Sequence, residues 1–340
     1  MQKYDLAIAI RIGSSQSTVA LVQTTFESIM SNIGECKYRF IISTDPDIPK
    51  SVKNYVSSLV SSEKTRIEFL GEEKIYWSEF INKAIEASQD CKYFIVAHDD
   101  IQVITKNFYR KTLNKIERIE EPAAWISFDD AGYTFGLWSP PTRSGYFSDR
   151  IDGWAKRKLF QFHNLPDCWW KLSATERLRN KTVNLLRPLL KKNALEYHPI
   201  SEKDLDFPTQ PVKCHAPWNM FVMIKTSVLH ELGPCEHWNT FNALLVDEDW
   251  GLRAMQKKRW NIWIPNVKYI HMRSNVKGGG NRSQQMVMKD LKRVGSLFRK
   301  KWGFSSNPTE DELLYIKKTY SNSFIPWSIN RLSYSWDSIH

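Results

Sequence analysis

The sequence has few cysteines, and none of them is spaced as a metal knuckle would require. The five are Cys36, Cys91, Cys168, Cys214 and Cys235, and no CxxC pair occurs among them. Their odd number and wide separation argue against both a zinc site and a disulfide framework. A reducing compartment fits this usage best, so we expect a cytoplasmic protein.

Long apolar runs are also missing. No stretch approaches the roughly 20 apolar residues that a membrane-spanning helix needs. The N-terminus enters a strand-like run without the charged leader and cleavage site of a signal peptide. We therefore expect a soluble protein, for which peripheral contact with the inner face of a membrane stays open. The sequence contains neither internal repeats nor low-complexity tracts.

Aromatic side chains and positive charge, by contrast, are abundant. The 340 residues include 14 Trp, 13 Tyr and 17 Phe, and the formal net charge is +11. Most aromatic residues fill cores, although they also line grooves that hold ring-shaped ligands. The positive charge favours an anionic partner and does not choose among a nucleotide diphosphate, a nucleic acid and an acidic membrane surface.

The first 130 residues alternate strand and helix patterns. Apolar runs typical of buried strands cover residues 4–12, 37–44, 65–70, 93–97 and 123–128. Helical periodicity covers residues 17–33, 50–60, 77–88 and 108–120. This alternation predicts βαβ units and a mostly parallel sheet flanked by helices. Ligands of such sheets bind beyond the carboxyl ends of the strands.

After residue 130 the pattern loosens. Residues 129–211 mix turn residues with aromatic ones and include a basic helical stretch. Residues 214–232 return to a strand followed by a helix, and residues 261–270 form a late strand pattern. The last sixty residues predict helices and an irregular tail.

The fourth strand runs directly into His98, Asp99 and Asp100. Adjacent carboxylates raise each other's pKa unless a cation lies between them. Mg²⁺ or Mn²⁺ would meet this need, because hard divalent ions bind carboxylate oxygens and bridge to substrate phosphates. An acidic turn in contact with water explains the same residues equally well.

Two further constellations follow later in the chain. Asp247, Glu248 and Asp249 open a helix, where acids are favoured by the helix dipole and also suit a general base. His271 ends the late strand, and a basic glycine-rich loop that includes Arg282 comes after it. That loop can either close over phosphates or simply face solvent.

The order and spacing of these elements resemble the GT-A fold glycosyltransferases and are similar to glycosyltransferase family 2. The resemblance covers about residues 4–275. It implies an α/β fold of the GT-A, Rossmann-like type, with an acceptor-side extension and a helical C-terminal tail. It divides the chain into a nucleotide-sugar-binding half (1–130), an acceptor-binding and catalytic half (131–275), and a C-terminal loop and tail (276–340).

The resemblance also implies roles for individual residues. In that family a DxD motif binds the metal, and here its first Asp is replaced by His98. Asp100 takes the place of the metal-binding aspartate, with His98 and His271 as further ligands of Mn²⁺ or Mg²⁺. Asp249 matches the catalytic base, with Glu248 beside it. The residues expected to contact the donor are Ile10, Arg11, Asp45, Asp99 and Arg282.

The resemblance therefore implies a glycosyltransferase that moves a sugar from a nucleotide-diphosphate sugar, with a UDP-sugar expected, to an acceptor hydroxyl. The acceptor is expected to be a glycan, a lipid-linked molecule or a protein, docked on the aromatic segment 133–170. The resemblance also implies metal dependence and, with Asp249 as the base, inversion at the anomeric carbon.

Other classes of protein stay open. A nucleic-acid-binding protein accounts for the charge and the aromatic residues but leaves the acidic clusters unexplained. A peripheral membrane protein accounts for the basic, partly amphipathic stretch 171–193. A nucleotidyltransferase would show a glycine-rich phosphate loop after the first strand, where this chain has a single glycine.

Overall fold

A computed structural model describes residues 3–13, 17–73, 75–119, 122–130, 211–214, 221–238, 245–271 and 284–304. Several predicted features lie outside the described residues: the docking segment 133–170, the basic stretch 171–193, the loop with Arg282, and the tail after residue 304.

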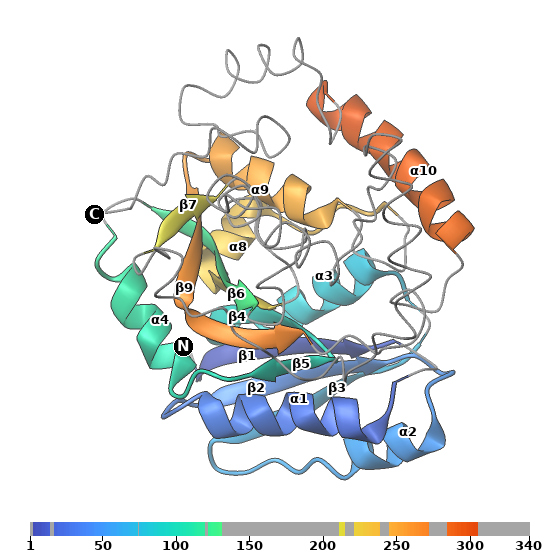
Figure 1. The fold of residues 1–340 in the computed structure, drawn as a ribbon, viewed down its shortest axis with the longest axis vertical. Coiled ribbons are helices and arrows are strands. Elements are labelled where there is room, and N and C mark those ends of the chain that lie inside the picture. Colours follow the sequence, from blue (N-terminus) through green and yellow to red (C-terminus); the bar gives the residue numbers. More distant parts are fainter. Residues whose placement is uncertain are drawn as a thin grey trace, which may run out of the picture.

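Nine described strands form one sheet in the order β3-β2-β1-β4-β8-β6-β9-β5, and β7 pairs with β9 (Figure 1). Their bounds are β1 Tyr4–Ile12, β2 Tyr38–Thr44, β3 Thr65–Glu72, β4 Cys91–His98, β5 Ile101–Val103, β6 Ala123–Asp130, β7 Val212–Cys214, β8 Phe221–Lys225 and β9 Trp260–His271.

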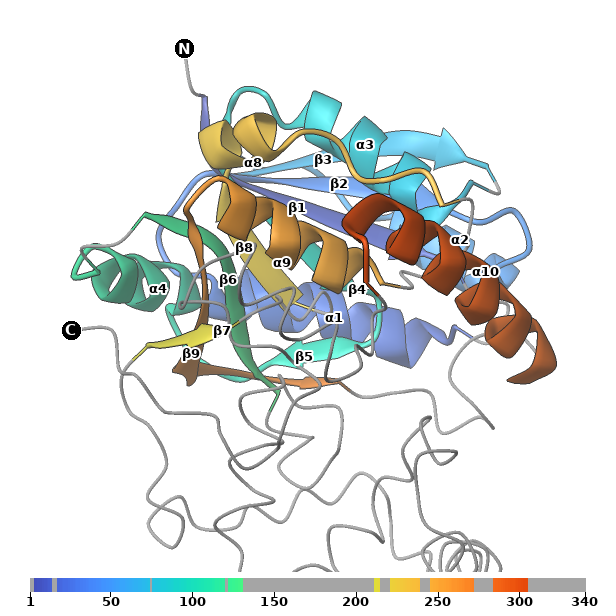
Figure 2. The ribbon, with the colours of Figure 1, turned by 90° about the horizontal axis from the view of Figure 1, so that it is seen from above.

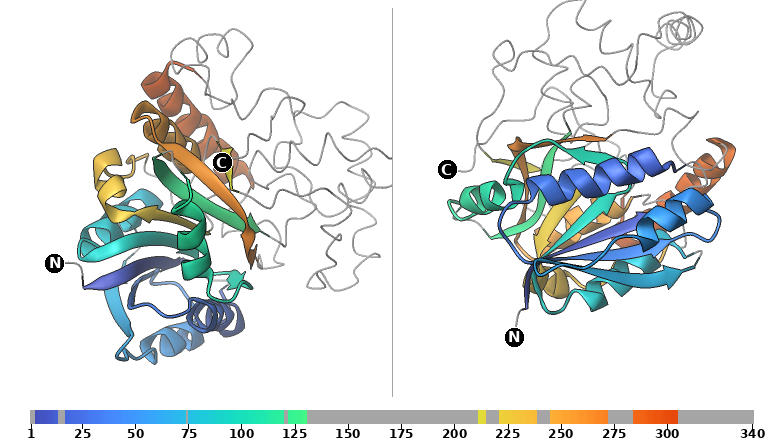
Figure 3. Two further views of the ribbon diagram at one scale, coloured as in Figure 1. Left: turned by 90° about the vertical axis from the view of Figure 1, so that its left-hand side faces the viewer. Right: turned by 90° about the horizontal axis from the view of Figure 1, so that it is seen from below.

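The first half of the sheet is parallel, as the sequence predicts. β1 pairs in parallel with β2 and β4, and β2 pairs in parallel with β3. The central strand β1 reads as a continuous apolar run because both of its faces are covered, and Leu6 to Ile12 are all buried. The edge strand β3 is largely exposed by comparison. The second half is mixed, since β8 lies antiparallel between β4 and β6 while β6 and β9 are parallel (Figure 3).

Helices cover both faces of the sheet, which confirms the predicted α/β class. Their bounds are α1 Val19–Asn32, α2 Lys50–Ser57, α3 Trp77–Ala87, α4 Phe108–Ile116, α8 Thr226–Leu232, α9 Val246–Gln256 and α10 Gln284–Trp302. One core cluster joins α1, α2 and α4 to one face of the sheet, and a second joins α3, α8 and α9 to the other (Figure 1). None of the described helices has the length and apolarity needed to cross a bilayer.

The helix α10 lies beside α9 (Figure 2) and docks through a small cluster of its own. Val294, Phe298 and Trp302 lie on one side of α10 and pack with Leu252 of α9 and with Trp238. The i, i+4, i+8 spacing of the three α10 residues places them on one face of the helix. α10, the described helix of the predicted C-terminal part, is therefore attached to the sheet domain through α9.

A polar stripe on α1 holds the turn that joins β4 to β5. The hydroxyl of Thr25 donates to the carbonyl of Asp99 (2.9 Å) and accepts from the N–H of Ile101 (3.1 Å). Ser28 accepts from the N–H of Val103, and Asn32 donates to its carbonyl. These bonds replace the partners that a three-residue strand at the edge of a sheet lacks. They position the acidic turn.

Thr25→Val should lower the free energy of unfolding by about 1–3 kcal/mol, because the buried N–H of Ile101 loses its acceptor while the side-chain volume is kept. The matched control is Thr24→Val, whose hydroxyl bonds to the carbonyl of Ala20 within the helix. Urea denaturation of both variants measures the difference. An equal loss in the two variants would show that the turn does not depend on α1.

Candidate functional site

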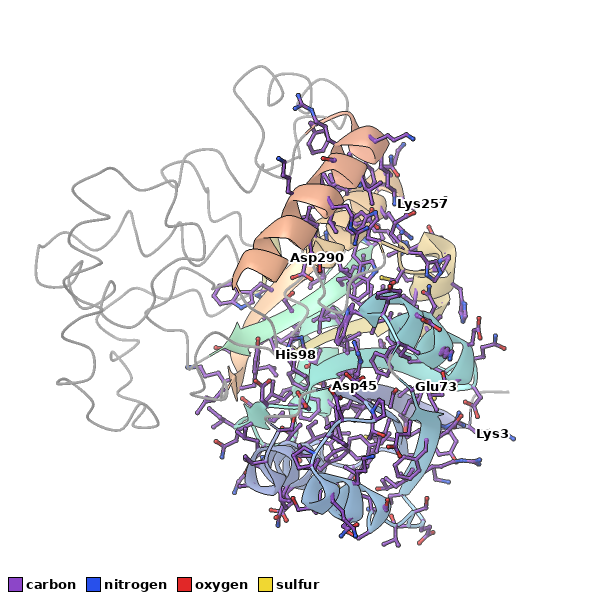
Figure 4. The ribbon with its side chains drawn as sticks, turned by 90° about the vertical axis from the view of Figure 1, so that its right-hand side faces the viewer. Lys3, Asp45, Glu73, His98, Lys257 and Asp290 are labelled. Atoms are coloured by element: carbon purple, nitrogen blue, oxygen red, sulfur yellow. The ribbon has the colours of Figure 1, made fainter. Side chains whose placement is uncertain are left out.

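The carboxyl ends of three parallel strands bring predicted site residues together. Arg11 of β1 lies opposite Ser43 of β2 on one side and opposite His98 of β4 on the other. Asp45 follows β2 directly, and its N–H bonds to the carbonyl of Ile12. Figure 4 shows Asp45 and His98 at this edge of the sheet. Because parallel strands end at the same edge, residues far apart in sequence converge here.

Arg11 and Asp45 form a buried ion pair. The Arg11 Nη2 atom lies 2.8 Å from Asp45 Oδ1 and 3.1 Å from Oδ2, and Nε lies 3.2 Å from Oδ1. The two residues are only 7% and 4% exposed. A forked contact of this kind holds a carboxylate in a defined orientation. A Cβ atom on Gly13 would lie 3.3 Å from Asp45 Oδ2, so glycine leaves room beside the pair.

Ile10, the other predicted donor contact on β1, has a different environment. Its side chain is fully buried in the core cluster on the α1 side of the sheet. Both residues are predicted to contact the donor. The Arg11 side chain lies in the polar cluster at the strand ends, whereas the Ile10 side chain is part of the hydrophobic core.

The acidic turn is held by contacts on each of its residues. Ser17 donates to Asp99 Oδ2 (3.1 Å). The His98 ring meets the indole of Trp77, at the start of α3, edge-on with 5.5 Å between the ring centroids. His98 Nδ1 lies 4.0 Å from Asp100 Oδ1, and both side chains are partly exposed. His98 and Asp100 thus lie together, whereas Asp99 is bound toward α1.

The predicted metal site can be tested against this arrangement. His98 and Asp100 offer one nitrogen and one carboxylate, close enough for one ion to contact both. Within the described residues, no group of three or more His, Cys, Asp or Glu side chains is placed to hold a metal. Ions such as Mg²⁺ are often held by one or two protein ligands together with substrate phosphates and water, so the two residues fit that mode of binding.

His271, the third predicted ligand, ends β9. Its backbone pairs with Ile101, the residue that follows Asp100. The position of its side chain lies outside the described part of the structure. The strand register therefore brings the chain at His271 to the acidic turn, and its role as a ligand stays a prediction.

Asp249 lies in the first turn of α9 and is almost completely buried, with 1% of its surface exposed. Its Oδ1 atom is 2.7 Å from Lys301 Nζ and accepts from Trp302 Nε1 at 3.0 Å. Its Oδ2 atom is 2.7 Å from Arg253 Nε. Both carboxylate oxygens thus lie against positively charged groups or hydrogen-bond donors. The assignment of Asp249 as the base stays a prediction, but this environment suits a fixed anion.

Glu248, its neighbour, has the opposite character. Burial raises the pKa of its carboxyl group from the ordinary value of 4.5 to about 7, and the negative charge of Asp249 adds to the rise. A carboxyl group with such a pKa exchanges a proton near neutral pH, which is the property that a general base or acid requires.

The His98 side chain and the start of α9 lie on the same face of the sheet. Trp77, which contacts His98, belongs to the same core cluster as Trp250 of α9. The indole of Trp250 stacks on Trp125 of β6 with ring centroids 4.2 Å apart. Asn82 of α3 exchanges two hydrogen bonds with the backbone of Cys235, in the segment that precedes α9. α3 therefore supports both groups.

A cavity of about 320 Å³ lies elsewhere, at the amino end of β6. Tyr93, Ala123, Lys225 and Arg259 are among the residues that line it, and it contains none of the predicted site residues. Since the chemistry gathers at the opposite ends of the strands, we do not assign the site to this cavity.

Sequence patterns alone could not identify several residues of the site. The i, i+4 spacing of Asp249 and Arg253 is a usable signal for an ion pair on one helix. Lys301 and Trp302 carry no such signal. They lie some fifty residues after Asp249, and no local sequence pattern indicates that the end of a later helix contacts that residue. Trp77 and Ser17 likewise read as ordinary core and loop residues.

No protein-family model matches the sequence, and no curated protein matches it. Among solved structures, GalNAc-T7 in a crystal structure with UDP, GalNAc and Mn²⁺ is similar with a TM-score of 0.48 and 12% identity, over 86% of this chain and 48% of that one. The mannosyltransferase PcManGT from Pyrobaculum calidifontis in complex with GDP-Man and Mn²⁺ gives a TM-score of 0.43 and 8% identity, over 80% of this chain and 58% of that one. This chain thus spans only 48% and 58% of the two proteins. At this level of likeness, function has to be argued from the side chains themselves.

The raised pKa of Glu248 makes stability depend on pH. Between the ordinary value of 4.5 and the folded value of about 7, the folded chain keeps a proton that the unfolded chain has released. The free energy of unfolding should therefore fall as pH rises through this window. Glu248→Gln should remove this part of the slope in urea titrations from pH 4.5 to 8, whereas Glu86→Gln, at an exposed position on α3, should not. Parallel slopes for wild type and Glu248→Gln would contradict the assignment.

Proposed function

We propose that the protein is a glycosyltransferase of the GT-A fold that transfers a sugar from a nucleotide-diphosphate sugar to an acceptor hydroxyl. The observation that carries the proposal is the convergence of Arg11, Asp45 and the His98–Asp100 turn at one edge of the parallel half-sheet. That edge is where open α/β sheets bind nucleotides. The partly exposed histidine and aspartate there supply the groups that a metal-bound diphosphate needs.

Arg11 and Asp45 are proposed to serve the nucleotide end of the donor. Arg11 holds the Asp45 carboxylate in place, which leaves the remaining lone pairs of that carboxylate to accept hydrogen bonds from a nucleotide base. Because the pair is formed before any ligand arrives, no ordering of these side chains has to accompany binding. Ser17 and Asp99 lie on the adjoining side of the same edge. Arg282, from the glycine-rich loop, remains a proposed contact with the phosphates.

Asp100 and His98 are proposed to hold the divalent metal, Mn²⁺ or Mg²⁺, with His271 as a further candidate. When bound, such an ion neutralises charge on the diphosphate as that group departs. Trp77 packs edge-on against the His98 ring. Thr25 fixes the backbone between Asp99 and Ile101. Trp77 and Thr25 thus hold the turn that carries the two proposed metal ligands, His98 and Asp100, from opposite faces of the sheet.

Glu248 and Asp249 are proposed to act on the acceptor with divided roles. Glu248 takes the proton from the attacking hydroxyl, since the pKa of its carboxyl group lies near neutral pH. Asp249 holds the start of α9 in place through its contacts with Lys301, Trp302 and Arg253. Direct attack with a single base would invert the anomeric configuration, and we propose that outcome. A glycan or lipid-linked acceptor would dock on the 131–275 half, with the 1–130 half holding the donor.

A panel of UDP, GDP, dTDP and CDP, each with and without Mn²⁺, tests the proposal. One diphosphate should raise the unfolding temperature in an ion-dependent manner, with a stabilisation of about 2.7 kcal/mol at a ligand concentration 100 times its Kd. Asp100→Ala should abolish the ion-dependent part, because it removes the carboxylate ligand. Asp47→Ala, an exposed aspartate on the loop after β2, should retain it. Equal affinity of wild type and Asp100→Ala for the nucleotide with Mn²⁺ in calorimetry would contradict the metal assignment.

The division of roles on α9 predicts an order of effects on turnover. Glu248→Gln should lower kcat by about 10²–10⁴-fold, the usual contribution of a general base, with the fold retained. At pH 8, Asp249→Asn should reduce kcat less than Glu248→Gln does, because the carboxyl group of Glu248, the proposed base, is still present. Sugar transfer is followed by the release of the nucleoside diphosphate. If Asp249→Asn is the more damaging change in a folded enzyme, the base is Asp249 instead.

A further inference from the structure

Four charged side chains form a closed ring beneath the start of α9. Asp249 binds Lys301 at 2.7 Å and Arg253 at 2.7 Å. Glu236 binds the same two cations, Lys301 through a short contact and Arg253 at 3.1 Å. Positive and negative charges therefore alternate around the ring. Each cation bridges the two acids, so the ring joins α9, α10 and the segment after α8.

The ring is asymmetric in its exposure. The side chain of Asp249 is 2% exposed, whereas those of Lys301 and Glu236 are 30% and 39% exposed. The indole N–H of Trp302, itself buried, also points to Asp249. A buried carboxylate without compensation is costly, and exposed pairs contribute little. The contacts that matter are therefore those that converge on Asp249, not those at the outer side of the ring.

The end of α10 supplies two of the three groups that bind Asp249. Phe298 and Trp302 anchor this helix against Leu252 of α9, which places the charged end of α10 next to the first turns of α9. Asp249 also donates its backbone N–H to the carbonyl of Leu245, the N-cap residue just before α9. Leu245 adopts a left-handed conformation, with φ of 56°, so the chain turns sharply there. The acidic first turn is thus held from outside its own helix.

We propose that Lys301 and Trp302 are positioning residues for the acidic pair of the transfer reaction: they fix Asp249 and thereby set the place and charge environment of Glu248. The proposal rests on the function proposed above. It assigns the C-terminal end of α10 a part in the active site, although no atom of α10 needs to touch the substrate. Among the described residues, the charged groups around the pair are Asp247 and Arg253 on α9, Lys301 on α10, and Glu236 beyond both cations.

Charge changes at the two ends of this contact should have opposite effects on Glu248. Lys301→Met leaves the negative charge of Asp249 less compensated, so the pKa of Glu248 should rise. Asp249→Asn removes that negative charge, so the pKa of Glu248 should fall. Lys300→Met makes the same substitution at an exposed position one residue earlier and should leave the pKa unchanged.

The decisive measurement uses the full chain with ¹³C-labelled glutamate. The carboxyl resonance of Glu248 is assigned by its loss in Glu248→Gln and is titrated by NMR in the absence of substrate. Opposite shifts for Lys301→Met and Asp249→Asn, with no shift for Lys300→Met, are expected. An unchanged pKa in Lys301→Met, or an equal shift in Lys300→Met, would overturn the proposal. Because this readout needs no turnover, it separates a failure of the positioning proposal from a failure of the transferase proposal.

Turnover then tests whether the positioning matters for the reaction. Lys301→Met should lower kcat by up to about 100-fold, as small displacements of reacting groups do, with little change in the KM for the donor. Its acidic limb in the pH profile should move to higher pH, and Lys301→Arg should restore most of the rate. Trp302→Phe keeps the aromatic packing and removes only the N–H, so it tests the same contact if Lys301→Met fails to fold. Equal rates for wild type, Lys301→Met and Trp302→Phe would refute a role in the reaction.

Discussion

A carboxylate that becomes buried on folding needs a positively charged group beside it. This requirement applies both at the strand ends, around Asp45, and at the start of α9, around Asp249. Asp45 is buried against Arg11 at the proposed nucleotide end, and Asp249 is buried against Arg253 and Lys301 at the proposed acceptor end. Each arrangement holds a carboxylate in a defined orientation. The groups left partly exposed beside them, such as the acidic turn, are then available for ligands.

The same helix supports both parts. α3 begins at Trp77, whose indole lies against His98. Five residues later, Asn82 of the same helix forms two hydrogen bonds with the backbone of Cys235, next to Glu236 of the ring of charges. Its apolar face is buried under the parallel strands. A rigid element shared by two groups keeps their separation constant, which a reaction between a donor and an acceptor requires. The opposite face contributes through α1, whose hydroxyl groups hold the acidic turn.

Periodicity and turn residues predicted most of the helices and strands, and they predicted where the strand ends would gather polar residues. They missed β5, because three residues are too few to show an alternation, and they did not reveal that β8 enters the sheet in the reverse direction. The order and direction of strands depend on how distant segments pack together, and a local sequence pattern does not contain that information. For the same reason Asp249 read as a helix-start acid, since the partners that bury it come from α10.

The central position of β8 has a consequence for how the chain acquires this shape during synthesis. β4 carries apolar residues on both faces, yet its second neighbour is supplied only when Phe221–Lys225 has been made, since Tyr93 pairs with Lys225. A nascent chain ending near residue 130 therefore presents an unpaired, hydrophobic strand edge, which is a template for association with other chains. We therefore expect the need for chaperones to be greatest while residues 131–220 are being made, before β8 can cover that edge.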